Sequence, residues 1–246
     1  MNNVSSEKKS LIINALSLVL LFVYITFVAL DIVAYVHGGV SGATFYLKLF
    51  ASFLCTAVAW AGFSAEKEKH GGLLRAIAFT LTFLGDTAVL LNTYKIMSDP
   101  FVFKIGGYLF VPALLLISIR SAKGFGFFFE GGRFQWKKLI FPLCFYIPFA
   151  VLLVSVGAGL AKVGLLGLGI VYGTCLTTVL WTGWESLHSG LFPHKSAVLI
   201  AAGSTLVFVM ELIGLVYNLH VPVYSDIAFF ATWILYTPGM LLIARS

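Results

Sequence analysis

The sequence predicts an all-α membrane protein, a polytopic bundle of about eight transmembrane helices that forms one domain over residues 1–246. Three observations lead to this prediction. Hydrophobic residues make up 60% of the chain and charged residues only 11%, whereas a soluble domain carries roughly 25% charged residues. The mean hydropathy is +0.99, and a soluble chain of this length cannot bury so much apolar surface. The third observation is a series of apolar runs that are each long enough to cross a bilayer.

Eight apolar runs follow one another with short connections. Crossing about 30 Å of hydrocarbon takes roughly 20 residues of helix. The runs are continuously apolar and do not alternate with polar residues, which favours helices over a β-barrel. The first run has no small-residue cleavage site, so we expect a retained helix and not a signal peptide. The predicted spans are residues 11–36, 44–64, 72–94, 102–119, 139–158, 163–182, 197–217 and 223–243.

The distribution of lysine and arginine predicts the orientation. With the N-terminus in the cytoplasm, the outer side holds only Lys48, Lys95, Lys104 and Lys162, and the other basic residues are cytoplasmic. By the positive-inside rule, both termini are expected in the cytoplasm. The net charge of +6 therefore reflects orientation, and because the basic residues form no stripe, no nucleic-acid partner is expected. The expected location is a plasma membrane, that of a bacterium (its inner membrane) being favoured over the endoplasmic reticulum.

The longest connection, residues 121–138, mixes aromatic and basic side chains. Both kinds of side chain are stable at the level of the lipid headgroups, which predicts a cytoplasmic interfacial anchor. The same composition also suits contact with anionic lipid, or a lid over a lipid-binding groove. The aromatic residues of this connection are Phe125, Phe127, Phe128, Phe129, Phe134 and Trp136.

Asp86 and Glu211 are the most informative residues because each falls deep inside a predicted span. An ionisable group in a span costs about 2.5–3.5 kcal/mol on insertion scales and marks a functional site by default. Each lies about fourteen residues into its helix, or about 21 Å from the inner face. Asp31, Lys48 and Asp226 share this outer level but lie close to helix ends, so these three are expected to be mainly structural.

A lysine at this level would change what the two acids can do. A Lys48 ammonium beside either carboxyl group would hold that group ionised, while the second acid would keep its proton. Two acids in unlike environments are the minimum for acid–base catalysis on an uncharged bond. Tyr172 is a weaker candidate, because it lies between Gly169 and Gly173 and this spacing more often marks close helix packing.

Neither a metal nor a cofactor is expected. The three cysteines, Cys55, Cys144 and Cys175, lie in apolar runs without metal-ligand spacing and are typical of small buried hydrophobes. The sequence contains no nucleophile elbow, no phosphate-binding glycine loop and no zinc-protease motif. A membrane lipid is the expected partner, and the sequence makes no prediction of oligomeric state.

The order of short motifs over residues 44–246 resembles the YhhN-like lysoplasmalogenase family. The motifs correspond to that family's lysine at the start of helix two, its Gly-Asp signature in helix three and its G-x-x-x-F pattern in helix four. They also correspond to its helix-six tyrosine, its G-A-x-x-F-x-x-S-D motif in helix seven and its closing Y-x-A-Q-x-L-I segment. The matching segments are YLK at 46–48, FLGD at 83–86, Gly106 with Phe110, Tyr172, GSTLVFVME at 203–211 and ILYTPGMLLIARS at 234–246.

The resemblance implies hydrolysis of the vinyl ether bond of a lysoplasmalogen, which gives a fatty aldehyde and a glycerophospho-base. It implies that Asp86 and Glu211 divide the catalytic work. One would protonate the alkene carbon, and the other would stabilise the resulting cation and activate water, with the assignment open. Lys48 would orient the lipid phosphate or tune one carboxylate, and Tyr172 would contact the substrate.

The sequence departs from the family pattern at three places. The second aspartate is Glu211, the histidine of helix four is Leu114, and the terminal Ala-Gln is Pro238-Gly239. A member with altered lipid specificity or without catalysis therefore stays open. A transporter or a lipid-binding protein is a further alternative, because buried acids with a lysine also suit coupled permeases. No convincing repeat is evident between the first four and last four spans, which disfavours a transporter.

Overall fold

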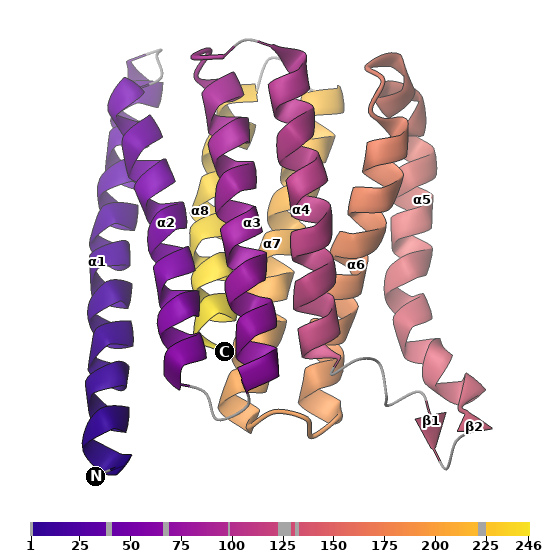
Figure 1. The fold of residues 1–246 in the computed structure, drawn as a ribbon. Helices are drawn as coiled ribbons and strands as arrows, with labels where there is room; N and C mark the ends of the chain where they lie inside the picture. Colours follow the sequence, from indigo (N-terminus) through magenta and orange to yellow (C-terminus); the bar gives the residue numbers. More distant parts are fainter. Residues whose placement is uncertain are drawn as a thin grey trace.

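The computed structural model of the chain describes residues 2–37, 41–65, 69–97, 99–122, 129–130, 133–220 and 225–246. These residues form eight α-helices: α1 Asn2–Val36, α2 Gly42–Ala65, α3 Lys69–Thr93, α4 Pro100–Ser121, α5 Ile140–Lys162, α6 Leu166–His188, α7 His194–His220 and α8 Ser225–Arg245 (Figure 1). Before α5, the two-residue strands β1 (Phe129–Glu130) and β2 (Arg133–Phe134) pair antiparallel, and a 3-10 turn, η2 (Trp136–Leu139), follows them. The predicted all-α architecture is confirmed.

Seven of the described helices, α1 to α7, are long and apolar enough to cross a membrane. The eighth helix, α8, lies where the last span is predicted, and both ends of the chain lie toward the same end of the bundle (Figure 1). The chain is therefore a multi-pass membrane bundle. The largest difference from the predicted spans is at α1, which begins at Asn2 and not at residue 11. Apolarity marks only the part of a helix inside the hydrocarbon, so a helix that continues into water is longer than its apolar run.

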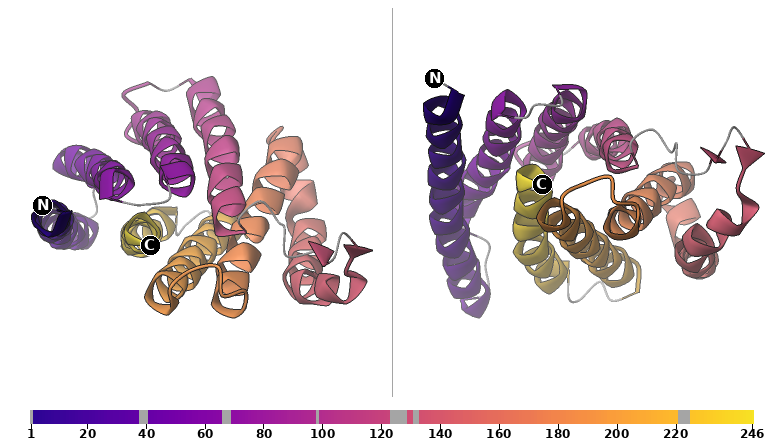
Figure 2. Two further views of the ribbon diagram at one scale, coloured as in Figure 1. Left: turned by 60° about the horizontal axis from the view of Figure 1, so that its bottom comes forward. Right: turned by 90° about the horizontal axis from the view of Figure 1, so that it is seen from below.

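The helices form two extensively packed pairs, and the second helix of each pair also packs on a helix outside that pair. Helix α3 packs most extensively on α4, and α7 on α8, while α4 also packs on α6 and α8 on α2. Helices α1 and α5 lie at opposite ends of the bundle (Figure 2). Glycines bring the backbones of each pair together, since a Cβ on Gly106 would lie 3.0 Å from the Gly85 carbonyl oxygen. Likewise, a Cβ on Gly203 would lie 2.7 Å from the carbonyl oxygen of Gly239, so small residues set both contacts.

The last helices of the two halves, α4 and α8, have closely matching sequences. Residues 109–117 read LFVPALLLI, and residues 235–243 read LYTPGMLLI. Both segments carry a proline inside the helix, Pro112 in α4 and Pro238 in α8. The match therefore includes a proline, which is unusual inside a helix.

Helices α3 and α7 match in the same way. Residues 80–86 read TLTFLGD, and residues 205–211 read TLVFVME. This match places the two deep acids, Asp86 and Glu211, at equivalent positions. The separation between equivalent residues is one residue longer for the α4–α8 pair than for the α3–α7 pair, so the repeat does not keep a single register.

A hydrogen bond occurs twice at equivalent places. Trp60 of α2 donates its indole N–H to the Thr80 hydroxyl at 3.0 Å, and Trp184 of α6 donates to the Thr205 hydroxyl at 3.1 Å. The packing repeats as well, because the fourth helix of each half lies on the second helix of the other. The expectation that the halves show no repeat is therefore wrong. The shifting register and the unlike first helices conceal the repeat in a continuous alignment.

A tyrosine of α1 compensates for the proline of α8. Pro238 has no amide hydrogen, so the carbonyl of Ile234 lacks its helical donor. The Tyr24 hydroxyl donates to that carbonyl at 3.0 Å. Satisfying a freed carbonyl from a neighbouring helix is what allows a proline inside a membrane helix. This contact also joins α1 to α8.

Candidate functional site

Polar residues recur every four positions along α2 and so share one helix face. They are Thr44, Lys48, Ser52 and Thr56, and none of them is more than 9% exposed. A row of buried polar residues in an apolar helix requires partners on the neighbouring helices. The row provides residues to two polar clusters, one around Lys48 and the other around Asp86.

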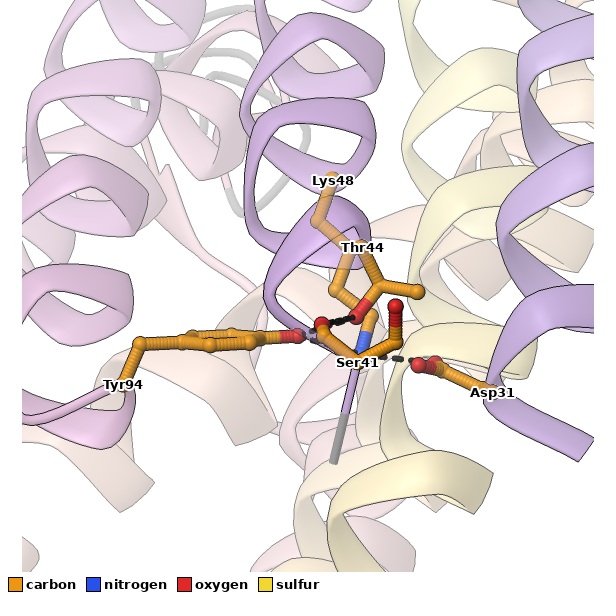
Figure 3. Close-up of polar contacts among 5 residues, drawn as sticks. All are labelled: Asp31, Ser41, Thr44, Lys48 and Tyr94. Carbon is orange, nitrogen blue, oxygen red and sulfur yellow. Dashed lines mark hydrogen bonds and ion pairs between the residues drawn. The ribbon is translucent and has the colours of Figure 1, made fainter. Parts of the chain in front are cut away.

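The first cluster surrounds the ammonium group of Lys48 (Figure 3). Its Nζ lies 2.7 Å from a carboxylate oxygen of Asp31 in α1 and donates to the Tyr94 hydroxyl at 3.3 Å. The hydroxyl groups of Tyr94 and Thr44 are 2.6 Å apart, and Thr44 donates to the Ser41 carbonyl. The rings with centroids 5.8–5.9 Å from Nζ are those of Phe27, Tyr94 and Trp233. Charge, hydroxyl and aromatic contacts together stabilise a cation inside the bundle.

This cluster places Lys48 differently from the sequence prediction. The prediction set Lys48 beside the two deep acids, with Asp31 apart as a structural residue. The structure joins Lys48 to Asp31, and the Lys48 side chain is 0% exposed. A fully enclosed ammonium has no face open to a lipid phosphate. Lys48 therefore acts within the bundle, where it connects α1 to α2.

The second cluster holds Asp86, which is 4% exposed, among hydroxyl groups. The Ser52 hydroxyl of α2 donates to one carboxylate oxygen at 2.5 Å. The Tyr236 hydroxyl of α8 lies 2.7 and 2.8 Å from the two oxygens. Asp86 therefore receives donors from two other helices, α2 and α8.

Glu211 of α7 has a similar partner, because the Tyr172 hydroxyl of α6 donates to its carboxylate. The Tyr172 ring packs edge-on against Phe110 of α4, with 6.3 Å between ring centroids. The structure therefore joins Tyr172 to Glu211 directly, while Asp86 has its own hydrogen bonds with Ser52 and Tyr236.

Two cavities adjoin the pair of acids, and they differ in character. A small cavity of about 10 Å³ lies between α2, α3 and α8, and Ser52 and Tyr236, the two donors to Asp86, are among its lining residues. A larger cavity of about 90 Å³ lies between α5, α6 and α7. We call the larger cavity the apolar slot, because Tyr172 and Glu211 are its only hydrogen-bonding side chains among the lining residues. The small cavity thus adjoins the two donors of Asp86, and the apolar slot adjoins Glu211 itself.

The internal repeat relates the two acid sites to each other. By the sequence matches, Glu211 is equivalent to Asp86 and Phe110 is equivalent to Tyr236. Both aromatic rings reach the neighbouring half, but only Tyr236 has a hydroxyl to donate. The difference gives Asp86 a donor from the other half that Glu211 does not receive from Phe110.

Sequence reasoning missed the hydroxyl residues around Asp86. Ser52 and Tyr236 carry no charge, and nothing local marks an uncharged side chain in an apolar run as a partner of a distant acid. A signal was nevertheless present in the four-residue spacing from Lys48 to Ser52 along α2. The Asp31–Lys48 pair was missed because depth along a helix was counted while the facing direction was not.

Two predictions concern residues outside the described part of the chain. The side chain of Asp226 is not described, and neither are the side chains of residues 123–134 in the aromatic connection. The remaining aromatic residue of that connection, Trp136, is 74% exposed. An exposed tryptophan next to a membrane helix is typical of the headgroup region.

The described residues contain no group of three or more histidine, cysteine or acidic side chains that could hold a metal ion. Comparisons with known protein families, curated proteins and solved structures found no match to this chain.

Proposed function

We propose that this protein is a membrane hydrolase that cleaves the vinyl ether bond of a lysophospholipid, as a lysoplasmalogenase does. The observation that supports the proposal is that the two acids adjoin unlike cavities: Glu211 lines the apolar slot, and the two hydrogen-bond donors of the buried Asp86 line a water-sized polar cavity. Hydrolysis of a lipid bond needs an alkyl-chain site and a water site on opposite sides of the reacting atoms. We place the protein in a cell membrane, with the bacterial inner membrane as the proposed location.

The two cavities suggest how the acids divide the work. Glu211 lines the apolar slot, so it is the proposed acid that protonates the alkene carbon of the lipid. The cation that forms at the neighbouring carbon is stabilised by the carboxylate of Asp86. Water adds to this carbon and gives up a proton to Asp86. The resulting hemiacetal transfers its hydroxyl proton to the glycerol oxygen and releases an aldehyde and the glycerol hydroxyl, so one water molecule is consumed for each bond cleaved. Return of the proton from Asp86 to Glu211 resets the two acids.

Tyr172 holds the acid of this scheme in place. Its hydroxyl donates to Glu211, and its ring is fixed against Phe110. Tyr172 also lines the apolar slot, where it would contact the substrate. Lys48 has a supporting part only, since it is enclosed and paired with Asp31.

The test is aldehyde release from a lysoplasmalogen by the protein purified in detergent. Asp86→Asn and Glu211→Gln are each expected to reduce release at least about 100-fold, the usual contribution of a general acid or base. Glu185→Gln is the matched control, because Glu185 is a half-buried carboxylate of α6 that does not line either cavity. If the unaltered protein released no aldehyde from any vinyl ether lipid, the hydrolase proposal would be wrong.

The internal repeat favours one other function, that of a transporter. Many transporters consist of two related halves with the substrate site between them. Here the paired acids lie where the fourth helix of each half packs on the second helix of the other. Protein reconstituted in liposomes with a pH-sensitive dye inside would separate the functions. A proton flux that Asp86→Asn abolishes, without aldehyde release, would support the transporter.

A further inference from the structure

A hydroxyl group in the wall of the small cavity has no partner. The cavity measures about 10 Å³, which is close to the space that one water molecule needs. Thr237 of α8 lines this cavity, and its side chain is 3% exposed. Within the described part of the chain, its hydroxyl forms no hydrogen bond. A buried hydroxyl is normally paired with protein or with an ordered water molecule, so Thr237 calls for an explanation.

The bonding of Thr237 differs from that of other helical threonines in this chain. Thr80, Thr82 and Thr87 of α3 each donate to the carbonyl four residues earlier, at 2.9, 3.0 and 2.7 Å. A threonine in a helix usually satisfies its hydroxyl in this way. Among the described residues Thr237 makes no such bond. Its hydroxyl proton is therefore available to a molecule in the cavity.

Two other hydroxyl groups of the cavity wall can only accept. The Ser52 proton is donated to Asp86, and the Thr82 proton is donated to the Ala78 carbonyl. Each oxygen keeps a lone pair for a further donor. A water molecule in the cavity could accept from Thr237 and donate to Ser52 and Thr82. Three hydrogen bonds are typical of a buried water molecule.

We infer that this cavity binds one ordered water molecule and that Thr237 positions it for the reaction at Asp86. Ser52 connects the two, because it accepts from the water and donates to Asp86. When the water adds to the cation, its proton passes to the Ser52 oxygen as the Ser52 proton passes to Asp86. The number of protons is conserved, and Ser52 is unchanged. The catalytic part of this inference rests on the proposed function, whereas the binding of water does not.

The internal repeat indicates which substitution of Thr237 is suitable for a test. The residue equivalent to Thr237 in the first half is Val111, which has the same shape without the hydroxyl. The hydroxyl is thus present only on the side of the bundle where the polar cavity lies. Valine is accepted at the equivalent position of α4, so Thr237→Val is expected to fold.

The stability of Thr237→Val reports on the water directly. If water pairs with the hydroxyl, the variant lowers the midpoint of thermal unfolding in detergent by about 2–8 °C. If the hydroxyl is unpaired, replacing it with a methyl group leaves the midpoint unchanged or raises it, which would overturn the inference. Thr237→Ser keeps the hydroxyl donor, so its unfolding midpoint is expected to fall less than that of Thr237→Val. Thr87→Val is the matched control, because the hydroxyl of Thr87 bonds its own helix.

Activity tests the positioning role separately. Thr237→Val is expected to lower kcat for aldehyde release at least about tenfold with KM unchanged, and Thr237→Ser to restore most of it. A higher KM with an unchanged kcat would overturn the positioning role. If the unaltered protein released no aldehyde, the proposed function would fail. The unfolding midpoints, and density for a water molecule in a high-resolution structure, would still decide whether the cavity is hydrated.

Discussion

The Tyr236 hydroxyl in α8 lies 2.7 and 2.8 Å from the two carboxylate oxygens of Asp86 in α3. The two residues are 150 positions apart and belong to different halves of the chain. The contact exists because α8 packs on α2 while α2 packs on α3. A carboxylate in an apolar bundle is stable only with such donors, so the packing of the halves and the chemistry of the acid depend on each other.

Tyr236→Phe is expected to weaken both stability and activity. The change removes a hydrogen bond to a buried carboxylate while the ring is kept, and such a bond contributes about 1–3 kcal/mol to the free energy of unfolding. Chemical unfolding in detergent and aldehyde release measure the two effects. Tyr146→Phe is the matched control, since Tyr146 bonds Thr178 outside the site. Equal losses in both variants would show that the Tyr236 hydroxyl has no special part at Asp86.

Lys48→Met is expected to destabilise the protein by about 3–5 kcal/mol, because it leaves the buried carboxylate of Asp31 without its cation. Replacing both partners, as in Lys48→Met with Asp31→Leu, removes the unpaired charge and is expected to recover much of the loss. The free energies of unfolding of the two single variants and the double variant give the coupling. Lys162→Met, at an exposed position in the last turn of α5, should change little. Additive effects of the two single changes would contradict the pairing.

Tyr24→Phe is expected to lower the free energy of unfolding by about 0.6 kcal/mol, and by at most about 1.7 kcal/mol, which is what hydrogen bonds between membrane helices contribute. The cost arises because the Ile234 carbonyl, freed by Pro238, loses its donor. Pro238→Ala supplies an amide hydrogen within the helix, so Tyr24→Phe should cost less in that background. Unfolding free energies of the four combinations test this coupling. An equal cost of Tyr24→Phe in both backgrounds would mean that the proline does not create the need for Tyr24.

Leu212→Trp is expected to shorten the lipid chain that the protein accepts. Leu212 lines the apolar slot, and a larger ring there removes space for methylene groups. The ratio of kcat/KM for long-chain to short-chain substrates should fall, and binding of a non-cleavable alkyl ether should fall in parallel. Leu143→Trp is the control, because Leu143 of α5 is exposed to the surroundings and does not line the slot. A uniform loss at all chain lengths would mean that the slot does not hold the chain.

The sequence predicts much of this fold because membrane helices leave a direct trace in hydropathy. Every predicted span coincides with a helix, and only the ends differ, as at Asn2. The deep acids, Asp86 and Glu211, are also evident from the sequence, since an ionisable group in the hydrocarbon costs free energy and is rare there. The repeat puts them at equivalent positions on equivalent helices.

The rest of the site depends on which helix faces face each other, and hydropathy does not contain that information. Ser52 and Thr237 are ordinary residues for a membrane helix until α2, α3 and α8 come together. The Asp31–Lys48 pair depends on the rotation of α1, because an acid in a long apolar run does not show which side of the helix faces α2. The repeat is visible in short segments of α3 and α7 and of α4 and α8, and paired contacts such as Trp60–Thr80 and Trp184–Thr205 extend it to α2 and α6.

Because the two related halves belong to one chain, the two acid sites can acquire different substitutions. Two separate copies of a four-helix subunit would be identical, so any substitution would enter both places at once. They would form either two hydrated pockets or two pockets for hydrocarbon. A covalent fusion removes this constraint, so that one acid can keep a tyrosine and a threonine beside it while its twin has Phe110 and Val111. A single chain with two related halves can therefore hold two unlike acid sites, which two identical subunits cannot.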